Sequence, residues 1–251
     1  KPHQYLASKN VQQLQNALRD QEIDTEPISG LENALVLKER ANVFTTEQFK
    51  DGWFEVQDAS SQQVAHLLNP KSGMRVVDAC AGAGGKSLHI ATLMENKGQI
   101  IAMDLYENKL NELKRRARRN GIHNLETRVI DSSKAIKKLI GKADKVLIDA
   151  PCTGLGVLKR NPDTKWKLQP EFLEEIKKTQ QEILQSYSKM VKEEGELVYA
   201  TCSILPSENH LQVKEFLSSE NGKSFTLVKE ETIFPSESGF DGFYMALLKK
   251  K

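Results

Sequence analysis

From residue 75 onward, short apolar runs alternate with longer amphipathic segments. The apolar runs are typical of buried strands and cover residues 75–79, 99–104, 126–130, 145–150 and 196–201. The segments between and after them have helical spacing and cover residues 86–95, 106–120, 133–140, 171–192 and 207–218. Repeated strand–helix–strand units with nearly continuous apolar strands predict a parallel sheet covered by helices on both faces. Two later runs, residues 224–229 and 242–249, predict an antiparallel hairpin at one edge. The expected fold is therefore α/β, a doubly wound and mostly parallel sheet of seven strands.

The first 57 residues have a different pattern. They predict one helix, residues 8–21, and two short strands, residues 34–38 and 53–57. This is too little for an independent globule, so we expect residues 1–57 to form a small α+β lobe appended to a domain of residues 58–251. Asp58 stands where the N-cap of the next helix is expected, with Pro70 marking the exit of that helix.

Composition narrows the class of protein. The chain has 251 residues, of which 39% are hydrophobic and 28% charged, and the two fractions together exclude disordered and low-complexity classes. No apolar run approaches the roughly 20 residues of a membrane span, and no basic-then-apolar leader opens the chain. Because it opens on Lys1 rather than Met, we expect further residues upstream in the natural protein. Three widely spaced cysteines without a C-x-x-C pair argue against a disulfide scaffold or a zinc site and indicate a reducing cytosol.

The charge is unevenly distributed. Lys and Arg number 36 and Asp and Glu 34, a formal net charge of +2, but residues 1–60 carry six basic and ten acidic side chains. Six of the eleven residues 109–119 are basic, a second basic cluster covers residues 134–145, and a third contains Lys159, Arg160, Lys165 and Lys167. Such clusters are either solvated helix faces or the binding surface for a polyanion, and three in one half of the chain leave both interpretations open.

The first strand of the large domain ends at Asp78 and leads into a turn of small residues. The candidate cofactor loop consists of Cys80, Ala81, Gly82, Ala83, Gly84, Gly85 and Lys86. Small side chains let a ligand approach the backbone, and the start of the next helix offers unpaired N–H groups. A P-loop would need Gly where Cys80 stands, and a dinucleotide fingerprint would need Gly where Ser87 stands, so both phosphate-binding patterns are absent. The alternative is a tight strand–helix turn that binds no ligand.

Acidic and thiol side chains follow the other strand ends. Asp104 ends the second strand, where a carboxylate can accept both ribose hydroxyls of a nucleoside; alternatively it caps the next helix. Asp131, Asp149, Cys152 and Cys202 follow the third, fourth and fifth strands, so we expect them at the same rim of the sheet. Free cysteines are usually buried apolar residues, but two at one rim favour reactivity. A ribose-binding Asp without a phosphate pattern suits S-adenosylmethionine as the cofactor.

Several motifs carry a resemblance to a known family. They are Asp-Gly-Trp at 51–53, Gln-Asp-Ala-Ser at 57–60, Asp-Ala-Pro-Cys-Thr-Gly at 149–154, Arg-Asn-Pro-Asp-Thr-Lys-Trp at 160–166, Ala-Thr-Cys-Ser at 200–203 and Asp-Gly-Phe-Tyr at 241–244. With these motifs the chain resembles, over essentially its whole length, the RNA 5-methylcytosine methyltransferases of the Sun/Fmu (RsmB-like) family. It departs from the family at Ala83, where Pro is frequent. Members of the family often carry a helical RNA-binding domain upstream, which the printed sequence does not include.

The resemblance implies a class I, Rossmann-like S-adenosylmethionine-dependent methyltransferase and assigns roles to four catalytic residues. Cys202 would be the nucleophile that adds to carbon 6 of cytosine, and Cys152 would assist removal of the carbon 5 proton and release of the enzyme. Asp149 would bind near ring nitrogen 3. Lys86 would lower the pKa of the thiol or contact the cofactor; alternatively it is a plain helix N-terminal lysine. The cofactor site would comprise the loop of residues 80–86 with Asp104, Asp131 and Asp149.

The resemblance also implies an RNA substrate, with small-subunit ribosomal RNA favoured and transfer RNA as the alternative. The basic clusters would contact phosphates, and Trp166 would either stack on a nucleotide or pack as a lid on the sheet rim. Two other classes remain as alternatives: a methyltransferase acting on a small molecule or protein, and a non-catalytic RNA-binding module that retains the fold. We expect a cytoplasmic monomer without a metal or a membrane contact.

Overall fold

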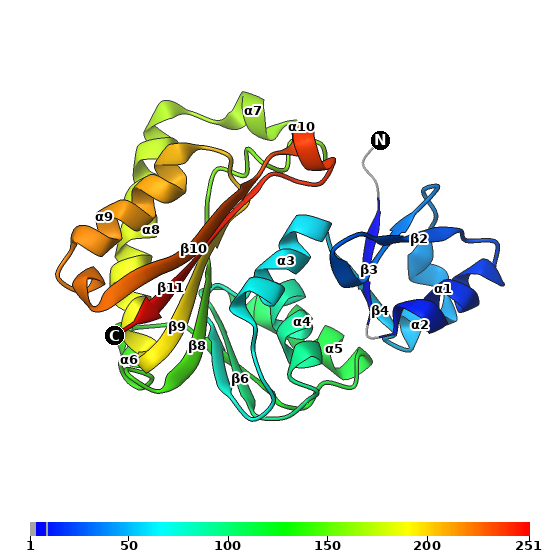
Figure 1. Cartoon of the computed structure of the whole chain (residues 1–251), viewed down its shortest axis with the longest axis horizontal. Helices are drawn as coiled ribbons and strands as arrows, with labels where there is room; N and C mark the ends of the chain where they lie inside the picture. Colours follow the sequence, from blue (N-terminus) through cyan, green and yellow to red (C-terminus); the bar gives the residue numbers. More distant parts are fainter. Residues whose placement is uncertain (1–3, 9) are drawn as a thin grey trace.

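A seven-stranded sheet forms the framework of the larger part of the chain. The computed structural model describes residues 4–8 and 10–251 and places the strands in the order β10-β11-β9-β8-β5-β6-β7 (Figure 1). The strand bounds are β5 Arg75–Asp78, β6 Gln99–Asp104, β7 Leu125–Val129, β8 Ala143–Asp149, β9 Val191–Thr201, β10 Phe225–Ile233 and β11 Phe243–Lys250. Strands β7, β6, β5, β8 and β9 are parallel, whereas β11 runs antiparallel to both β9 and β10. The predicted doubly wound, mostly parallel Rossmann-like sheet and its edge hairpin are confirmed.

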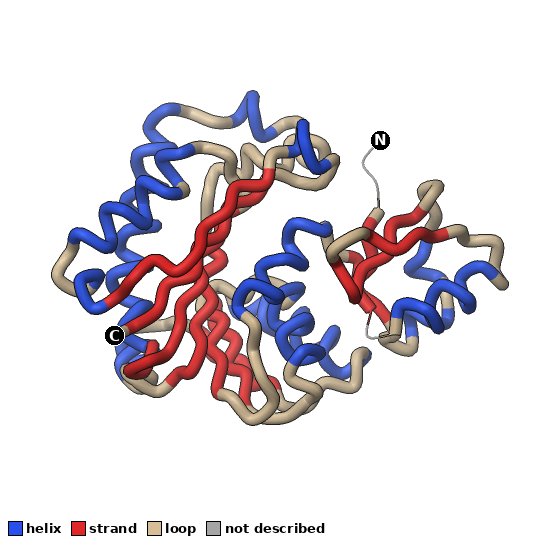
Figure 2. The backbone as a smooth tube through the Cα atoms, in the orientation of Figure 1, coloured by secondary structure: helices blue, strands red, loops and turns tan. Residues whose placement is uncertain are grey.

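Helices cover both faces of this sheet because its central strands are apolar on both sides (Figure 2). One face carries α3 Ala59–Leu68, α4 Gly85–Leu93 and α5 Glu107–Arg119, and the other carries α6 Ser133–Lys137, α8 Pro170–Tyr187 and α9 His210–Ser218. In β6, Ile100 and Ala102 belong to the first core, whereas Ile101 and Met103 belong to the second. This period of two divides one strand between two hydrophobic cores.

Helix α3 begins as the sequence predicts. The Asp58 carboxylate accepts a hydrogen bond from the Ser60 N–H at 2.9 Å, and the helix ends at Asn69 with a left-handed φ of 48°. Two further short helices, α7 Thr164–Lys167 and α10 Pro235–Ser238, lie in the loops above the sheet. None of the helices in the described part of the chain combines the length and the apolar composition needed to cross a membrane.

One predicted helix is too long. The pattern predicts a helix throughout residues 171–192, but α8 ends at Tyr187, a 3₁₀ turn covers Ser188–Met190, and β9 begins at Val191. No Gly or Pro separates the helix from the strand, so the sequence carries no stop signal there. The strand forms because Val191 is buried and pairs with Ala143 of β8.

The N-terminal lobe has a sheet and a core of its own. Its elements are β1 Tyr5–Ser8, α1 Val11–Arg19, β2 Thr25–Ile28, β3 Leu31–Leu37, a 3₁₀ turn at Val43–Thr45, α2 Glu47–Lys50 and β4 Phe54–Val56. The antiparallel strand order is β2-β3-β1-β4. The sequence predicted β3, β4 and the helix but missed β1 and β2, and it started the helix too early. The helix begins after Asn10, whose side chain accepts from the Gln13 N–H at 3.0 Å.

Candidate active site

The strand order reverses between β5 and β8, and the carboxyl ends of β5, β6, β8 and β9 meet there. Open α/β sheets bind ligands at such a point. We refer to this edge as the catalytic rim.

Backbone N–H groups of the candidate cofactor loop anchor the loop to strand β6. Ala81 N–H donates to the Met103 carbonyl at 2.8 Å, and Gly82 N–H donates to the Asp104 carboxylate at 2.8 Å. Gly84 has φ 88°, and a Cβ there would lie 2.4 Å from the Leu113 side chain, so only glycine fits between the loop and α5. The loop is thus fixed to β6 by contacts within the chain.

Asp78 anchors the start of α4 beneath this loop. Its carboxylate is fully buried and accepts a hydrogen bond from the Ser87 hydroxyl at 2.6 Å. Burial raises the pKa of Asp78 to about 7, and the hydrogen bond from Ser87 opposes this rise.

A cavity of about 180 Å³ opens beside the loop. It is lined by Ala79, Cys80, Gly82, Asp104, Leu105, Tyr106, Lys109, Ile130, Asp149, Pro151, Ile183 and Tyr187. Of the predicted cofactor residues, Cys80, Gly82, Asp104 and Asp149 line the cavity directly. The predicted residues Ala81, Ala83, Gly84, Gly85 and Lys86 form the rest of the loop and do not line it, and Asp131 is exposed next to Ile130.

The sequence missed the apolar walls of this cavity. The only sequence feature that marked Leu105 and Tyr106 was their position directly after Asp104, which ends a strand. Ile183 and Tyr187 come from α8, more than thirty residues after Asp149, and only the fold brings them to the cavity.

Lys86 and Asp149 form an ion pair at the catalytic rim. The Lys86 Nζ lies 2.6 Å from Asp149 Oδ2, and the lysine side chain is only 11% exposed. The ammonium also lies 4.9 Å from the centre of the Phe243 ring. The lysine is therefore held at the rim and is not a solvated helix N-terminal residue.

The two rim cysteines are in contact: Cys152 Sγ and Cys202 Sγ are 3.4 Å apart. The hydrogen bond between the two thiols lowers the pKa of Cys202, burial and the charge of Asp149 oppose this, and the charges of Lys86 and Arg160 lower it further. The same hydrogen bond, together with burial, raises the pKa of Cys152. Of the pair, Cys202 is the thiol that ionises more readily.

Cys80 behaves differently. Burial raises the pKa of the Cys80 thiol, and the carboxylates of Asp78, Asp149 and Asp104 raise it further. The third cysteine therefore stays protonated and is a poor nucleophile.

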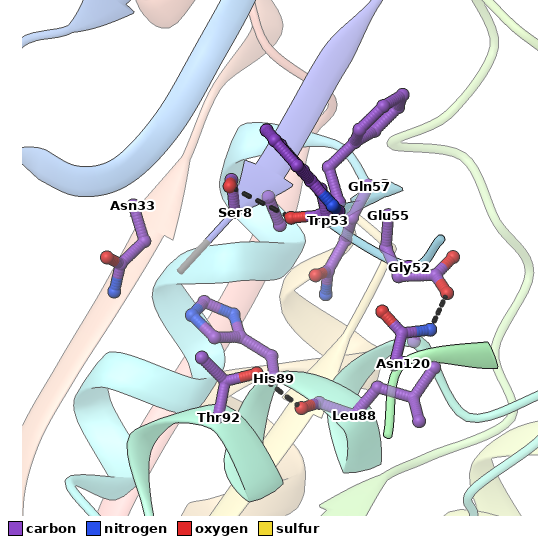
Figure 3. A pocket seen from close by; sticks show the side chains of 13 residues that line it. Ser8, Asn33, Gly52, Trp53, Glu55, Gln57, Leu88, His89, Thr92 and Asn120 are labelled. Carbon is purple, nitrogen blue, oxygen red and sulfur yellow. Dashed lines mark hydrogen bonds between the residues drawn. The ribbon is translucent and has the colours of Figure 1, made fainter. Parts of the chain in front are cut away.

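The basic cluster of residues 109–119 serves in part an interface inside the chain. Arg116 and Arg119 of α5 both pair with Glu55 of the lobe. Asn120 donates to the same carboxylate at 2.6 Å (Figure 3). The Arg119 guanidinium also lies 3.8 Å from the centre of the Phe49 ring. The expectation that the whole cluster faces RNA is therefore wrong for these two arginines.

The lobe interface encloses a cavity of about 30 Å³, lined among others by Trp53, Gln57 and His89 (Figure 3). Burial, and next the nearby His66, lowers the pKa of His89 to about 3. The cavity at the lobe interface holds about one or two water molecules and is too small for a nucleoside.

The third basic cluster, which contains Lys159, Arg160 and Lys165, also combines side chains paired within the chain with exposed ones. Arg160 donates to the Asp241 carboxylate at 2.6 Å, and Lys159 donates to the Gly239 carbonyl at 3.1 Å. Trp166 is 77% exposed in α7, with the Lys165 ammonium 4.9 Å from its ring. Trp166 is therefore not a lid packed on the rim, and the alternative of an exposed stacking surface remains.

Glu208 was not among the residues that the sequence pattern singled out. Its side chain is fully buried, and it accepts hydrogen bonds from both loops that carry the rim cysteines. It stands in a polar Pro-Ser-Glu-Asn segment of a kind usually found at the surface.

Comparison with known proteins places this geometry in a family. Residues 65–249 match the family model described as 16S rRNA methyltransferase RsmB/F. The chain is 36% identical over 258 residues to the ribosomal RNA small subunit methyltransferase B of Vibrio cholerae, covering 99% of this chain and 57% of that protein. The relative of the same name from Proteus mirabilis is 36% identical over 221 residues, covering 87% of this chain and 51% of that protein. The chain thus spans just over half the length of these curated relatives.

Solved structures agree on the fold. The crystal structure of PH0851 superposes with a TM-score of 0.93 at 32% identity, covering 100% of this chain and 60% of that one. The crystal structure of NSun6 from Pyrococcus horikoshii with SFG gives a TM-score of 0.89 at 21% identity, covering 100% of this chain and 91% of that one. The match of the family model over most of the chain and the identity to these relatives show that the chain belongs to the 16S rRNA methyltransferase RsmB/F family.

Proposed function

We propose that the chain methylates carbon 5 of a cytosine in RNA, with S-adenosylmethionine as methyl donor and small-subunit ribosomal RNA as substrate. The observation that carries this proposal is the contact between Cys152 and Cys202 at the catalytic rim, beside a cavity fit for a nucleoside. The names of the curated relatives support the RNA substrate. The NSun6 structure from Pyrococcus horikoshii was solved with SFG, which agrees with a nucleoside-type ligand.

The cavity residues fit S-adenosylmethionine. Asp104 lies at the cavity wall, where its carboxylate would accept the ribose hydroxyls, and the apolar side chains of Leu105 and Ile130 would contact the adenine. The loop of residues 80–86, Asp131 and Asp149 would complete the site. When bound, the cofactor supplies an electrophilic methyl group.

The remaining chemistry belongs to the chain and the base. Carbon 5 of cytosine is too weak a nucleophile until a thiolate adds to carbon 6. Cys202 would form that bond, since its pKa is the lowered one of the pair. Asp149, held by Lys86, would accept a hydrogen bond from a protonated ring nitrogen 3 and so favour the proton that neutralises the negative charge developing there.

Cys152 would act after methylation. Its thiol lies against Cys202. After Cys152 has lost its own proton to solvent, its thiolate would accept the carbon 5 proton, and the bond between Cys202 and carbon 6 would break with the electron pair leaving on the Cys202 sulfur. The target base must leave its stack to reach this rim. The exposed Trp166 next to Lys165 would then stack on a neighbouring nucleotide.

Two cysteine variants test the proposal. Cys202→Ser should abolish methyl transfer, because a hydroxyl is a far weaker nucleophile at neutral pH. Cys152→Ala should still attack and methylate but stall before release, leaving protein covalently joined to RNA as a denaturant-resistant band. The double variant should give no band.

The assay offers methyl-labelled cofactor with ribosomal RNA, transfer RNA and protein as acceptors, and bisulfite sequencing locates the product. Label in ribosomal RNA cytosines supports the proposal. Label in protein alone, or no adduct from either single variant, would overturn it.

A further inference from the structure

The two rim cysteines lie on separate loops, and a buried polar cluster joins these loops. Cys152 precedes Thr153 in the loop after β8, and Cys202 precedes Ser203 in the loop after β9. Between them lies Glu208, in the 3₁₀ turn Pro206–Glu208. All three neighbours are buried, with Glu208 and Ser203 at 0% exposure and Thr153 at 5%.

The two carboxylate oxygens of Glu208 bind both loops. Oε1 accepts from the Thr153 N–H at 2.8 Å and from the Gln180 amide at 3.0 Å. Oε2 accepts from the Thr153 hydroxyl at 2.6 Å and from the Ser203 hydroxyl. Gln180 also donates to the Pro151 carbonyl at 2.9 Å, so the residues on both sides of Cys152 are held.

Hydrogen bonds of Asn209 hold the loop that carries Cys202. Asn209 donates to the Ser203 carbonyl at 3.0 Å and accepts from the Thr201 hydroxyl at 2.6 Å. Both residues next to Cys202 are therefore fixed by the segment that contains Glu208. A buried carboxylate is costly unless it is fully hydrogen-bonded, and among the described residues Glu208 has no cationic partner.

We propose that Glu208 is a positioning residue that sets the contact between the two cysteine thiols. The importance of this contact for catalysis rests on the proposed function, whereas the positioning of the thiols by Glu208 does not. Glu208 cannot touch RNA or cofactor, because it is fully buried. It acts through Thr153 and Ser203, each bonded to a cysteine along the chain.

The hydrogen-bond pattern predicts that the geometry of Glu208 sets the thiol contact, whereas its charge acts on the pKa of Cys152. The partners of Oε1 can only donate, whereas both partners of Oε2 are hydroxyls, which can turn and accept. A glutamine can therefore place its carbonyl oxygen at the first position and its NH₂ group at the second. Glu208→Gln keeps the whole network, and Glu208→Ala removes it.

The first measurement needs no methyl transfer. The variants are equilibrated with reduced and oxidised glutathione, and the Cys152–Cys202 disulfide is quantified by peptide mass spectrometry. Each disulfide formed consumes one oxidised glutathione and releases two reduced ones, so the equilibrium constant reports how closely the thiols are held. We expect Glu208→Gln to match the parent chain and Glu208→Ala to lower the constant by about tenfold or more.

Thr153→Val provides a milder variant, and Thr46→Val is its matched control. Thr46 is likewise a buried threonine whose hydroxyl donates a hydrogen bond, to the Val43 carbonyl at 2.7 Å, but it lies in the N-terminal lobe. Thr153→Val should lower the disulfide constant and Thr46→Val should not. If Glu208→Ala does not fold, the comparison of Thr153→Val with Thr46→Val still tests the proposal.

The second measurement is methyl transfer to RNA. Glu208→Ala should lower kcat and leave the KM for RNA unchanged, and Glu208→Gln should restore kcat. An unchanged disulfide constant in both Glu208→Ala and Thr153→Val would overturn the positioning role, as would a Gln variant as impaired as Ala. Altered disulfide constants in a chain that methylates no RNA would instead refute the proposed function alone.

Discussion

Arg116 of α5 and Glu55 of the lobe form an ion pair, with Nη2 and Oε2 3.0 Å apart. The other terminal nitrogen of Arg116 donates to the Ala83 carbonyl at 2.7 Å, within the cofactor loop. One guanidinium thus connects the lobe to the loop that would hold the cofactor. The uneven charge of the chain, acidic at the start and basic later, is partly explained by this internal contact.

The first prediction concerns this ion pair. Glu55→Ala leaves Arg116 and Arg119, whose side chains are 18% and 21% exposed, without their carboxylate. Breaking such a pair from one side should lower the free energy of unfolding by about 2–4 kcal/mol. Urea denaturation of the variant and the parent chain measures this loss in the free energy of unfolding.

The matched control is Glu112→Ala. Glu112 also pairs with an arginine of α5, but Arg115 is 79% exposed, so the loss should stay within about 1 kcal/mol. Equal losses in the two variants would show that the lobe is not held by Glu55.

The second prediction divides the arginines of α5 by their function. Arg115 and Arg118 are exposed, whereas Arg116 and Arg119 face the lobe. Replacing Arg115 and Arg118 by Gln should weaken RNA binding and reduce the slope of its salt dependence by about one to two, without loss of stability. Replacing Arg116 and Arg119 should destabilise the chain and leave that slope unchanged. RNA affinity measured at several salt concentrations gives this slope. An unchanged slope in the variant of Arg115 and Arg118 would show that this face of α5 contacts solvent and not RNA.

The sequence predicted the central sheet well because its signal is local. Residues 99–104 match β6 at both ends, since an apolar run stops at a charged Asp. The strand-end positions of Asp104, Asp149 and the cysteines followed from the same alternation. The ranking of Cys202 above Cys152 came only from the resemblance, because both follow strand ends at the same rim.

What the sequence missed depends on contacts between distant segments. The short strands β1 and β2 are stabilised by pairing with β3, and four residues carry too little pattern to show this. The faces of α5 were misread because Glu55 lies about sixty residues away in the sequence. The burial of Glu208 likewise arises from Thr153 and Gln180, on other elements.

The third prediction tests the cofactor site. The Asp104 oxygens accept from the Gly82 and Tyr106 N–H groups at 2.8 and 2.9 Å, so the carboxylate both shapes the loop and faces the cavity. Asp104→Ala should weaken S-adenosylmethionine binding at least about tenfold, since charge-assisted hydrogen bonds to ribose would be lost. Isothermal calorimetry measures this, with Glu112→Ala as a control expected to bind normally. Unchanged affinity in Asp104→Ala would remove Asp104 from the site.

The fourth prediction concerns the pH dependence of Cys202. Its pKa is lowered first by the hydrogen bond with Cys152 and then, against burial and the charge of Asp149, by the charge of Lys86. A lowered pKa means that the reactive thiolate forms at lower pH. Lys86→Met removes the cation and also leaves Asp149, 2.6 Å away in the parent chain, as an uncompensated negative charge. Both effects disfavour the thiolate, so the pKa of Cys202 should rise.

Alkylation of Cys202 by iodoacetamide, followed by peptide mass spectrometry across pH, measures this shift. The midpoint should move to higher pH in Lys86→Met and return toward the parent value in Lys86→Arg, which keeps the charge. Lys109→Met is the control, because the charge of Lys109 acts on Cys80, and the Cys202 midpoint should stay in place. Since alkylation requires neither RNA nor cofactor, a midpoint unmoved by Lys86→Met would show that Lys86 does not tune the nucleophile, whatever the chain methylates.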